Sequence, residues 1–240
     1  MTSPDPLRFS RPLYTIAEAA RIVDVPASTF ATWAKGYVRH FPERSSVQGD
    51  SIITYIAPEQ RRGPSIPFVG LTEGFVLAAI RRSGVPLQRV RPALLALEEQ
   101  IGAAHALASK RLFTDGAEVL FDYGERRSDS ADGRAALDLV VVRSGQRVFV
   151  EAISEYLRKI EYAADGYAAL IHLPAYRTAE VVADPRRSFG APILERGGAR
   201  VEDVLERFWA GESLQELAQE FGVPANQLED VLRVASRRAA

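Results

Sequence analysis

The sequence predicts a mainly α-helical protein with small β-hairpins, in which two winged helix-turn-helix-like domains are joined by a helical and β-hairpin middle region. Two observations support this fold class. The stretch TIAEAARIVDVPASTF at residues 15–30 returns in related form, as SLQELAQEFGVPANQL, at residues 213–228. Between the copies, apolar residues recur at helical spacing, and LDLVVVRSGQRVFVEAI at residues 137–153 has the pattern of two strands joined by a turn.

Each copy begins with the same helix-starting motif. Thr15 with Glu18, and Ser213 with Glu216, form the S/T-x-x-E capping box, which satisfies free N–H groups at a helix N-terminus. Apolar residues follow at helical spacing, a Val-Pro pair then stops the first helix, and a second apolar pattern begins. A small alanine two residues after each glutamate allows the helices to cross closely. Each copy is therefore predicted to be a helix-turn-helix.

The two copies differ in the polar residues that their second helices present. The second copy carries Glu229 and Asp230, two carboxylates that a polyanion would repel. The first copy instead offers short donors and a cation, which suit phosphates and base edges. The first copy is therefore expected to contact DNA and the second to face protein. The predicted DNA-contacting residues of the first copy are Ser28, Thr29, Thr32 and Lys35.

Charge is unevenly distributed along the chain. Residues 1–112 carry 14 Lys and Arg against nine Asp and Glu, whereas residues 113–240 carry 16 against 22. This asymmetry favours different partners for the two halves, although scattered surface charge gives the same counts. Some basic residues of the first half could instead bond carboxylates such as Glu98. The further candidates for DNA contact are Arg39, Arg61, Arg62, Arg81 and Arg82, with Arg89 and Arg91 in the same helical region.

Local patterns predict elements in the first half. SIITYIA at residues 51–57 alternates and is β-branched, which predicts a short strand or wing beside the second helix of the first copy. Thr72 and Glu73 are expected to open a helix that stops near Gly84, and Pro92 is expected to kink the next helix or mark its start.

Further elements are expected in the second half. SDSADGR at residues 128–134 predicts a polar loop, SEYLRKIEYAAD at 154–165 a helix, and YAALIHLP at 167–174 a strand. EDVLERFWAG at 202–211 predicts an amphipathic helix that leads into the second copy. The residues that flank Gly197-Gly198 could pair as a small hairpin, which would make this domain winged.

The sequence offers no pattern for catalysis or for a metal. It has no cysteine, so disulfides and thiolate metal sites are excluded, and a reducing cytoplasm is the expected compartment. No signal peptide is expected at the start, and no apolar run approaches the roughly 20 residues of a membrane span. The histidines, His40, His105 and His172, fit no metal motif, and no nucleophile elbow or phosphate loop occurs. We therefore expect no catalytic residue, no metal, no cofactor and no membrane partner.

The first copy shares a pattern of positions with a known family of regulators. The pattern is Thr15-Ile16-x-Glu18-x-Ala20, Val25, Thr29-Phe30 and Trp33. With this pattern the first copy resembles the N-terminal helix-turn-helix of MerR-like regulators. Many members of that family have an arginine at the position of Ala31, so Lys35 or an arginine of the wing would have to supply the corresponding DNA contact.

A second pattern runs through roughly the last 60 residues. It consists of Asp184-Pro185, Phe189-Gly190-x-Pro192-Ile193, Gly198-Ala199-Arg200-Val201, Gly211-x-Ser213-x-x-Glu216-Leu217-Ala218 and Phe221-Gly222-Val223. This pattern is similar to a small winged domain of unknown function that recurs in bacterial antitoxins, in which threonine usually stands at the position of Ala199. Residues 103–122 are similar to the linker of full-length members. As a whole, the chain resembles a VapB-type antitoxin of a VapBC toxin–antitoxin pair.

This resemblance implies an antitoxin that silences a PIN-domain ribonuclease toxin and represses its own promoter. A homodimer is expected, because two-fold proteins read palindromic operators. PIN nucleases gather acidic residues around a metal, so an inserted arginine is a plausible inhibitor. The candidate toxin-binding residues are Arg186, Arg187, Arg237 and Arg238.

The resemblance also implies a division of the chain and leaves two alternatives open. A MerR-like transcription regulator with a partner- or ligand-sensing C-terminal domain and no toxin would share these features, as would a protein-interaction scaffold. The expected parts are a MerR-like DNA-binding region at 10–62, a helical support region at 63–125, a β-hairpin and connector at 126–176, and a winged domain at 177–240.

Overall fold

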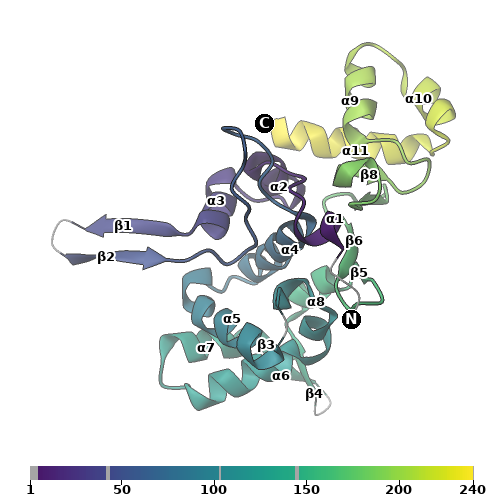
Figure 1. Cartoon of the computed structure of the whole chain (residues 1–240). Coiled ribbons are helices and arrows are strands. Elements are labelled where there is room, and N and C mark those ends of the chain that lie inside the picture. Colours follow the sequence, from purple (N-terminus) through teal and green to yellow (C-terminus); the bar gives the residue numbers. More distant parts are fainter. Residues whose placement is uncertain (1–4, 42–43, 103, 144–145, 240) are drawn as a thin grey trace. The chain divides into compact units, whose positions relative to one another are not determined.

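The computed structural model describes residues 5–41, 44–102, 104–143 and 146–239. The chain forms two compact units, Met1–Ala168 and Ala169–Ala240. The described residues are mainly helical and carry small antiparallel sheets, which confirms the predicted fold class (Figure 1). In the described part of the chain, no helix combines the length and the apolar character that a bilayer crossing requires.

The first unit contains most of the helices and two hairpins. Strand β1 pairs antiparallel with β2, with Tyr37 opposite Gly49, and β3 pairs antiparallel with β4, with Val140 opposite Phe149. The second pairing confirms the hairpin predicted within residues 137–153. The elements are α1 (Pro6–Phe9), α2 (Ile16–Ile22), α3 (Ala27–Lys35), β1 (Tyr37–Phe41), β2 (Arg44–Gly49), α4 (Phe68–Arg82), α5 (Leu87–Ile101), η1 (Ala106–Ala108), α6 (Lys110–Arg126), α7 (Ala131–Leu137), β3 (Val140–Arg143), β4 (Gln146–Phe149), α8 (Glu151–Leu157) and β5 (Ile160–Tyr162).

Helix α4 is the centre of the first unit. Every residue from Phe68 to Ile80 is buried, and α1, α2, α3, α5, α8 and η1 all contact this helix. Gly74 permits a close approach by α3, because a Cβ atom there would lie 2.5 Å from the ring of Phe30. The helix pair α2–α3 thus packs on a buried helix that α1, α5, α8 and η1 also contact.

The expected start of α4 was wrong. The helix begins at Phe68, after the extended residue Pro67, rather than at Thr72 and Glu73. Inside the helix, the Thr72 hydroxyl donates to the Phe68 carbonyl over 3.0 Å, and the Glu73 side chain is buried. In the sequence these two polar residues have the pattern of a helix start, but in the structure both make hydrogen bonds inside the unit.

The strand expected at residues 51–57 was also wrong. The strands of the hairpin beside α3 are the preceding residues 37–41 and 44–49, and residues 51–57 form no strand. Ile53 is buried, and the amide of Ile52 donates to the Trp33 carbonyl over 2.9 Å. The β-branched residues therefore pack against the end of α3 and do not form a sheet.

Residues 128–134, expected to form a loop, contain the start of α7. The Ser130 hydroxyl caps this helix by accepting the amide of Gly133 over 3.0 Å. A Cβ atom at Gly124 would lie 2.5 Å from Leu137, and one at Gly133 would lie 2.0 Å from the Arg127 carbonyl oxygen. Glycine is required at both positions because α6 and α7 cross closely.

Two further helix boundaries differ from the expectation. Of the two alternatives for Pro92, the helix start is wrong, because helix α5 begins at Leu87 and Pro92 lies inside it, while the kink stays a prediction. Helix α8 ends at Leu157, and residues 160–162, expected to continue the helix, form β5.

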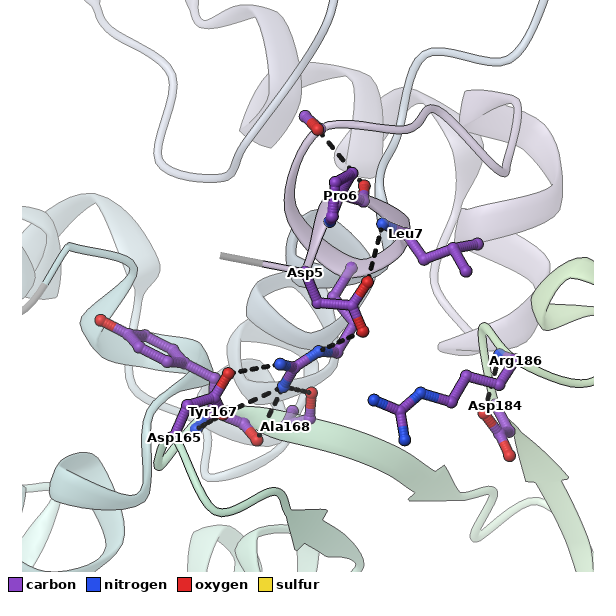
Figure 2. A network of polar contacts seen from close by, with 10 residues as sticks. Asp5, Pro6, Leu7, Asp165, Tyr167, Ala168, Asp184 and Arg186 are labelled. Atoms are coloured by element: carbon purple, nitrogen blue, oxygen red, sulfur yellow. Dashed lines mark hydrogen bonds and ion pairs between the residues drawn. The ribbon is translucent and has the colours of Figure 1, made fainter. Parts of the chain in front are cut away.

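The short helix α1 is fixed by a buried arginine, Arg8, which is 4% exposed. Its guanidinium donates to the Asp165 carboxylate over 3.1 Å and to the Ala168 carbonyl over 3.4 Å. The carboxylate of Asp5 in turn accepts the amide of Leu7 over 3.2 Å, and Figure 2 shows these partners around α1. The hydrogen bond from Arg8 holds the pKa of Asp165 below its ordinary value.

The second unit combines short strands with three packed helices. Strand β7 pairs antiparallel with β6, with Ile171 opposite Ala183, and with β8. A bridge between Ile193 and Arg200 confirms the small hairpin predicted across Gly197-Gly198. The elements are β6 (Ala168–His172), β7 (Val181–Ala183), η2 (Ser188–Gly190), β8 (Ile193–Leu194), α9 (Val201–Trp209), α10 (Leu214–Phe221) and α11 (Ala225–Ala239).

Candidate nucleic-acid interface

The first helix-turn-helix forms as the sequence predicts. Its capping box is complete, since the Thr15 hydroxyl accepts the Glu18 amide over 3.2 Å and the Glu18 carboxylate accepts the Thr15 amide over 2.8 Å. Asp24 provides the left-handed residue of the turn with φ of 59°, and Pro26 directly precedes α3. The second capping box is complete as well. The capping boxes fix where α2 and α10 begin, while α3 begins after Pro26 without a side-chain cap.

Helix α3 has a buried face and an open face. Phe30, Trp33 and Ala34 are buried against the unit. The opposite face is accessible, because Ser28 and Lys35 are exposed and Thr29 and Thr32 are half-exposed. The Thr32 hydroxyl donates to the Ser28 carbonyl over 2.9 Å, which leaves its oxygen as an acceptor. All four residues predicted on this helix thus lie on its accessible side.

The C-terminal end of α3 leads directly into the hairpin of β1 and β2. Lys35 is held above the ring of Tyr55, with Nζ 5.6 Å from the ring centroid. Gly36 then turns the chain with φ of 72°, and a Cβ atom there would lie 2.3 Å from the Gly49 carbonyl oxygen. Figure 1 shows the hairpin extending from this point. The backbone of Arg39 lies in β1, whereas its side chain is outside the part that the structure describes.

The other candidate arginines lie on two separate segments. Arg61 and Arg62 are exposed in the turn that precedes α4, where the Gly63 amide donates to the Gln60 carbonyl over 2.8 Å. Arg81 and Arg82 are exposed at the end of α4.

Arg82 already has partners within the unit. Its guanidinium bonds to Asp24 over 2.6 Å and lies 5.1 Å from the ring centroid of Tyr156. The pair with Asp24 ties the end of α4 to the turn of the helix-turn-helix.

In the second helix-turn-helix, the position of Asp230 contradicts the expectation. The Asp230 carboxylate does not face outward: the residue is fully buried and accepts the amides of Arg177, Thr178 and Ala179 over 2.6, 2.7 and 3.1 Å. Burial opposes ionisation, but these three bonds hold the pKa of Asp230 below its ordinary value. Glu229 is exposed, as expected. Asp230 therefore joins α11 to the loop before β7.

The candidate toxin-binding arginines lie on two elements of the second unit. Arg186 is exposed, and its amide donates to the Asp184 carboxylate over 2.8 Å (Figure 2). Arg187 is half-buried and donates to the Glu195 carbonyl over 3.4 Å. Arg237 and Arg238 are exposed near the end of α11.

A buried polar cluster of the first unit was not foreseen from the sequence. Glu73 of α4 binds Thr54 and His105, which lie 19 and 32 residues away along the chain. Such separations form no motif, so no sequence signal marks the cluster. Among the described residues, no group of three His, Cys, Asp or Glu side chains is arranged to hold a metal ion.

Comparisons with known proteins agree with this geometry. A family model described as "Putative DNA-binding HTH domain" matches residues 12–94, and one described as "Protein of unknown function (DUF433)" matches residues 181–235. The chain is 48% identical over 227 residues to "Putative antitoxin VapB45" of Mycobacterium tuberculosis, covering 94% of this chain and 95% of that protein.

A second curated relative and a solved structure come from the same organism. "Uncharacterized protein Rv2308" is 27% identical over 231 residues, covering 93% of this chain and 90% of that protein. The crystal structure of Rv2018 superposes with a TM-score of 0.84 at 45% identity, covering 94% of this chain and 99% of that chain.

The open polar face of α3, the hairpin beside it and the matched domain define a DNA-binding helix-turn-helix protein. The chain belongs to the VapB-type antitoxin family that includes VapB45.

Proposed function

We propose that the protein is an antitoxin that represses its own promoter as a homodimer and neutralises a PIN-domain ribonuclease toxin in the cytoplasm. The observation that carries the DNA-binding part is the accessible face of α3, with Ser28, Thr29, Thr32 and Lys35. The name of the relative VapB45 supports the antitoxin part.

In this proposal α3 lies in the major groove. The hydroxyls of Ser28, Thr29 and Thr32 can bond base edges or phosphates, and the ammonium of Lys35 neutralises a phosphate. Gly36 leads the chain from α3 directly into the hairpin. The exposed Arg61 and Arg62 are assigned to the flanking DNA backbone. Two protomers related by a two-fold axis would read the two halves of a palindromic operator.

Promoter binding by the full-length protein tests the DNA-binding part. We expect Thr32→Ala with Lys35→Ala to weaken binding about tenfold or more, because a base-edge or phosphate contact and a charge are removed. The matched control is Asn226→Ala with Glu229→Ala, which changes exposed residues of the second copy and should leave the affinity unchanged. Equal affinities for the two double variants would contradict the assignment of α3.

Co-expression with the adjacent reading frame tests the antitoxin part. The proposal expects copurification of a PIN-domain protein and rescue of the cells from growth arrest. Arg186→Ala with Arg187→Ala, and separately Arg237→Ala with Arg238→Ala, then show which pair, if either, contacts the toxin. A neighbouring protein without the acidic PIN pattern and without copurification would favour a MerR-like regulator that has no toxin.

A further inference from the structure

The segment of residues 52–56 connects α3 to α4, the central helix of the first unit. At one end, the amides of Ile52 and Ile53 both donate to the Trp33 carbonyl in the last turn of α3, over 2.9 and 3.4 Å. Tyr55 lies under the ammonium of Lys35. The segment therefore touches both the backbone and the charged side chain at the C-terminal end of α3.

The same segment is bound tightly to α4 through Thr54. A Cβ atom at Gly70 would lie 2.3 Å from the Thr54 carbonyl oxygen, so glycine is needed there for the segment to lie on the helix. The carboxylate of Glu73, which is 3% exposed, accepts the Thr54 amide and, over 3.1 Å, the Thr54 hydroxyl. A buried carboxylate thus holds one residue of the segment by both its main chain and its side chain.

His105 completes the cluster from the residue before η1. Its Nδ1 lies 3.0 Å from the Glu73 carboxylate and 2.9 Å from the Thr54 hydroxyl. His105 has φ of 57°, a left-handed conformation that is costly for a residue other than glycine, and its polar contacts offset part of that cost. The DNA-contacting residues assigned above leave this cluster without a role.

We infer that Glu73, Thr54 and His105 form a positioning cluster that fixes the 52–56 segment on α4 and so holds the end of α3, with Lys35, in the orientation that binds DNA. This inference rests on the proposed DNA-binding function. The residues of the cluster are positioning residues, because they act on DNA through Tyr55 and the end of α3.

Protonation of His105 strengthens its hydrogen bond to Glu73 in this cluster. The acids that face the imidazole among the described residues are Glu73 of α4 and Glu98 of α5, while α1 presents the ring of Phe9 at 5.6 Å. The bond to Glu73 raises the pKa of His105 against the opposing effect of burial. The charge-assisted bond is therefore fully present below the ordinary pKa of 6.5 and is lost as the pH rises through the raised value.

The first experiment compares Thr54→Val with Thr54→Ser in the full-length protein. Valine removes the hydroxyl that bonds Glu73 and His105, whereas serine keeps it. At a temperature where all variants are folded, we expect Thr54→Val to weaken promoter binding about fivefold. Thr54→Ser should keep most of the affinity of the unaltered protein. A lower melting temperature for Thr54→Val with unchanged affinity would overturn the inference, because the cluster would then only stabilise the fold.

The second experiment isolates the titration. The chain has three histidines, so His40→Gln with His172→Gln leaves His105 as the only one. We expect the promoter affinity of this variant to fall about fivefold between about pH 6 and about pH 8, and the further change His105→Asn to flatten the profile. The same pH dependence with and without His105 would overturn the inference. Absence of promoter binding by the unaltered protein would instead defeat the proposed function itself.

Discussion

One position of the repeated unit has opposite roles in the two copies. When the gapless pairing of residues 15–30 with 213–228 is continued by two positions, Thr32 corresponds to Asp230. Thr32 lies on the accessible side of α3, whereas Asp230 is buried beneath the amides of residues 177–179. The face that is open in the first copy is therefore covered at this position in the second copy. This contact distinguishes the two copies more firmly than the charge repulsion expected from the sequence.

Asp230 is accordingly expected to be important for the stability of the second unit. Asp230→Ala leaves three amides without their acceptor, and we expect a loss of about 3 kcal/mol in the free energy of unfolding. Chemical denaturation followed by circular dichroism measures this loss. Exposed Glu229 is the matched control, and Glu229→Ala should change the stability by less than about 0.5 kcal/mol.

The pH dependence of this contribution has a definite sign. Because the pKa of Asp230 is lowered in the folded protein, its stabilisation is present above the ordinary value of 3.8 and is lost as the pH falls through the lowered value. We expect Asp230→Asn to show less loss of stability between pH 5 and acidic pH than the unaltered protein, as measured by its melting temperature. Parallel acid profiles for the two proteins would contradict this assignment.

At the scale of elements, the sequence predicts those helices and strands that contacts between neighbouring residues determine. Both capping boxes, the β3–β4 hairpin and the amphipathic α9 follow from neighbouring residues, and the structure contains all of them. The β1–β2 hairpin was missed because RSSVQG has no apolar alternation. The strand expected at 51–57 was wrong because its β-branched residues pack on α3 and α4.

The candidate DNA-binding site could likewise be predicted from the sequence only in part. The open face of α3 follows from helical spacing, since the buried Phe30 and Trp33 determine which side remains accessible. The cluster of Glu73, Thr54 and His105 could not be predicted, because it depends on contacts between residues far apart in the chain.

The junction of α3 with the hairpin is the element most sensitive to added volume. Gly36→Ala would combine a positive φ with a Cβ atom 2.3 Å from the Gly49 carbonyl oxygen, whereas Gly84 has φ of 85° and nothing within 4 Å of such an atom. We expect Gly36→Ala to cost about 2 kcal/mol more than Gly84→Ala, measured by denaturation, and to weaken promoter binding. Equal costs for the two substitutions would show that the junction is not tightly packed.

At the scale of the whole molecule, the excess of Lys and Arg in residues 1–112 predicts that promoter binding depends strongly on salt. If both protomers of a homodimer place Lys35 on a phosphate, Lys35→Ala should reduce the slope of log K against log salt concentration by about 2. Thr32→Ala removes no charge and should leave the slope unchanged while lowering the affinity. A titration of promoter binding at several salt concentrations measures both effects, and a flat salt profile for the unaltered protein would count against the DNA-binding role.

DNA binding by the first copy is tested most directly by asking which copy of the repeated unit touches DNA. A photoreactive side chain placed at Ser28, and separately at the corresponding exposed position Asn226, reports the contact in the full-length protein bound to its promoter. We expect crosslinking to DNA from position 28 and none from position 226. Crosslinking from position 226, or from neither position while the promoter remains bound, would contradict it.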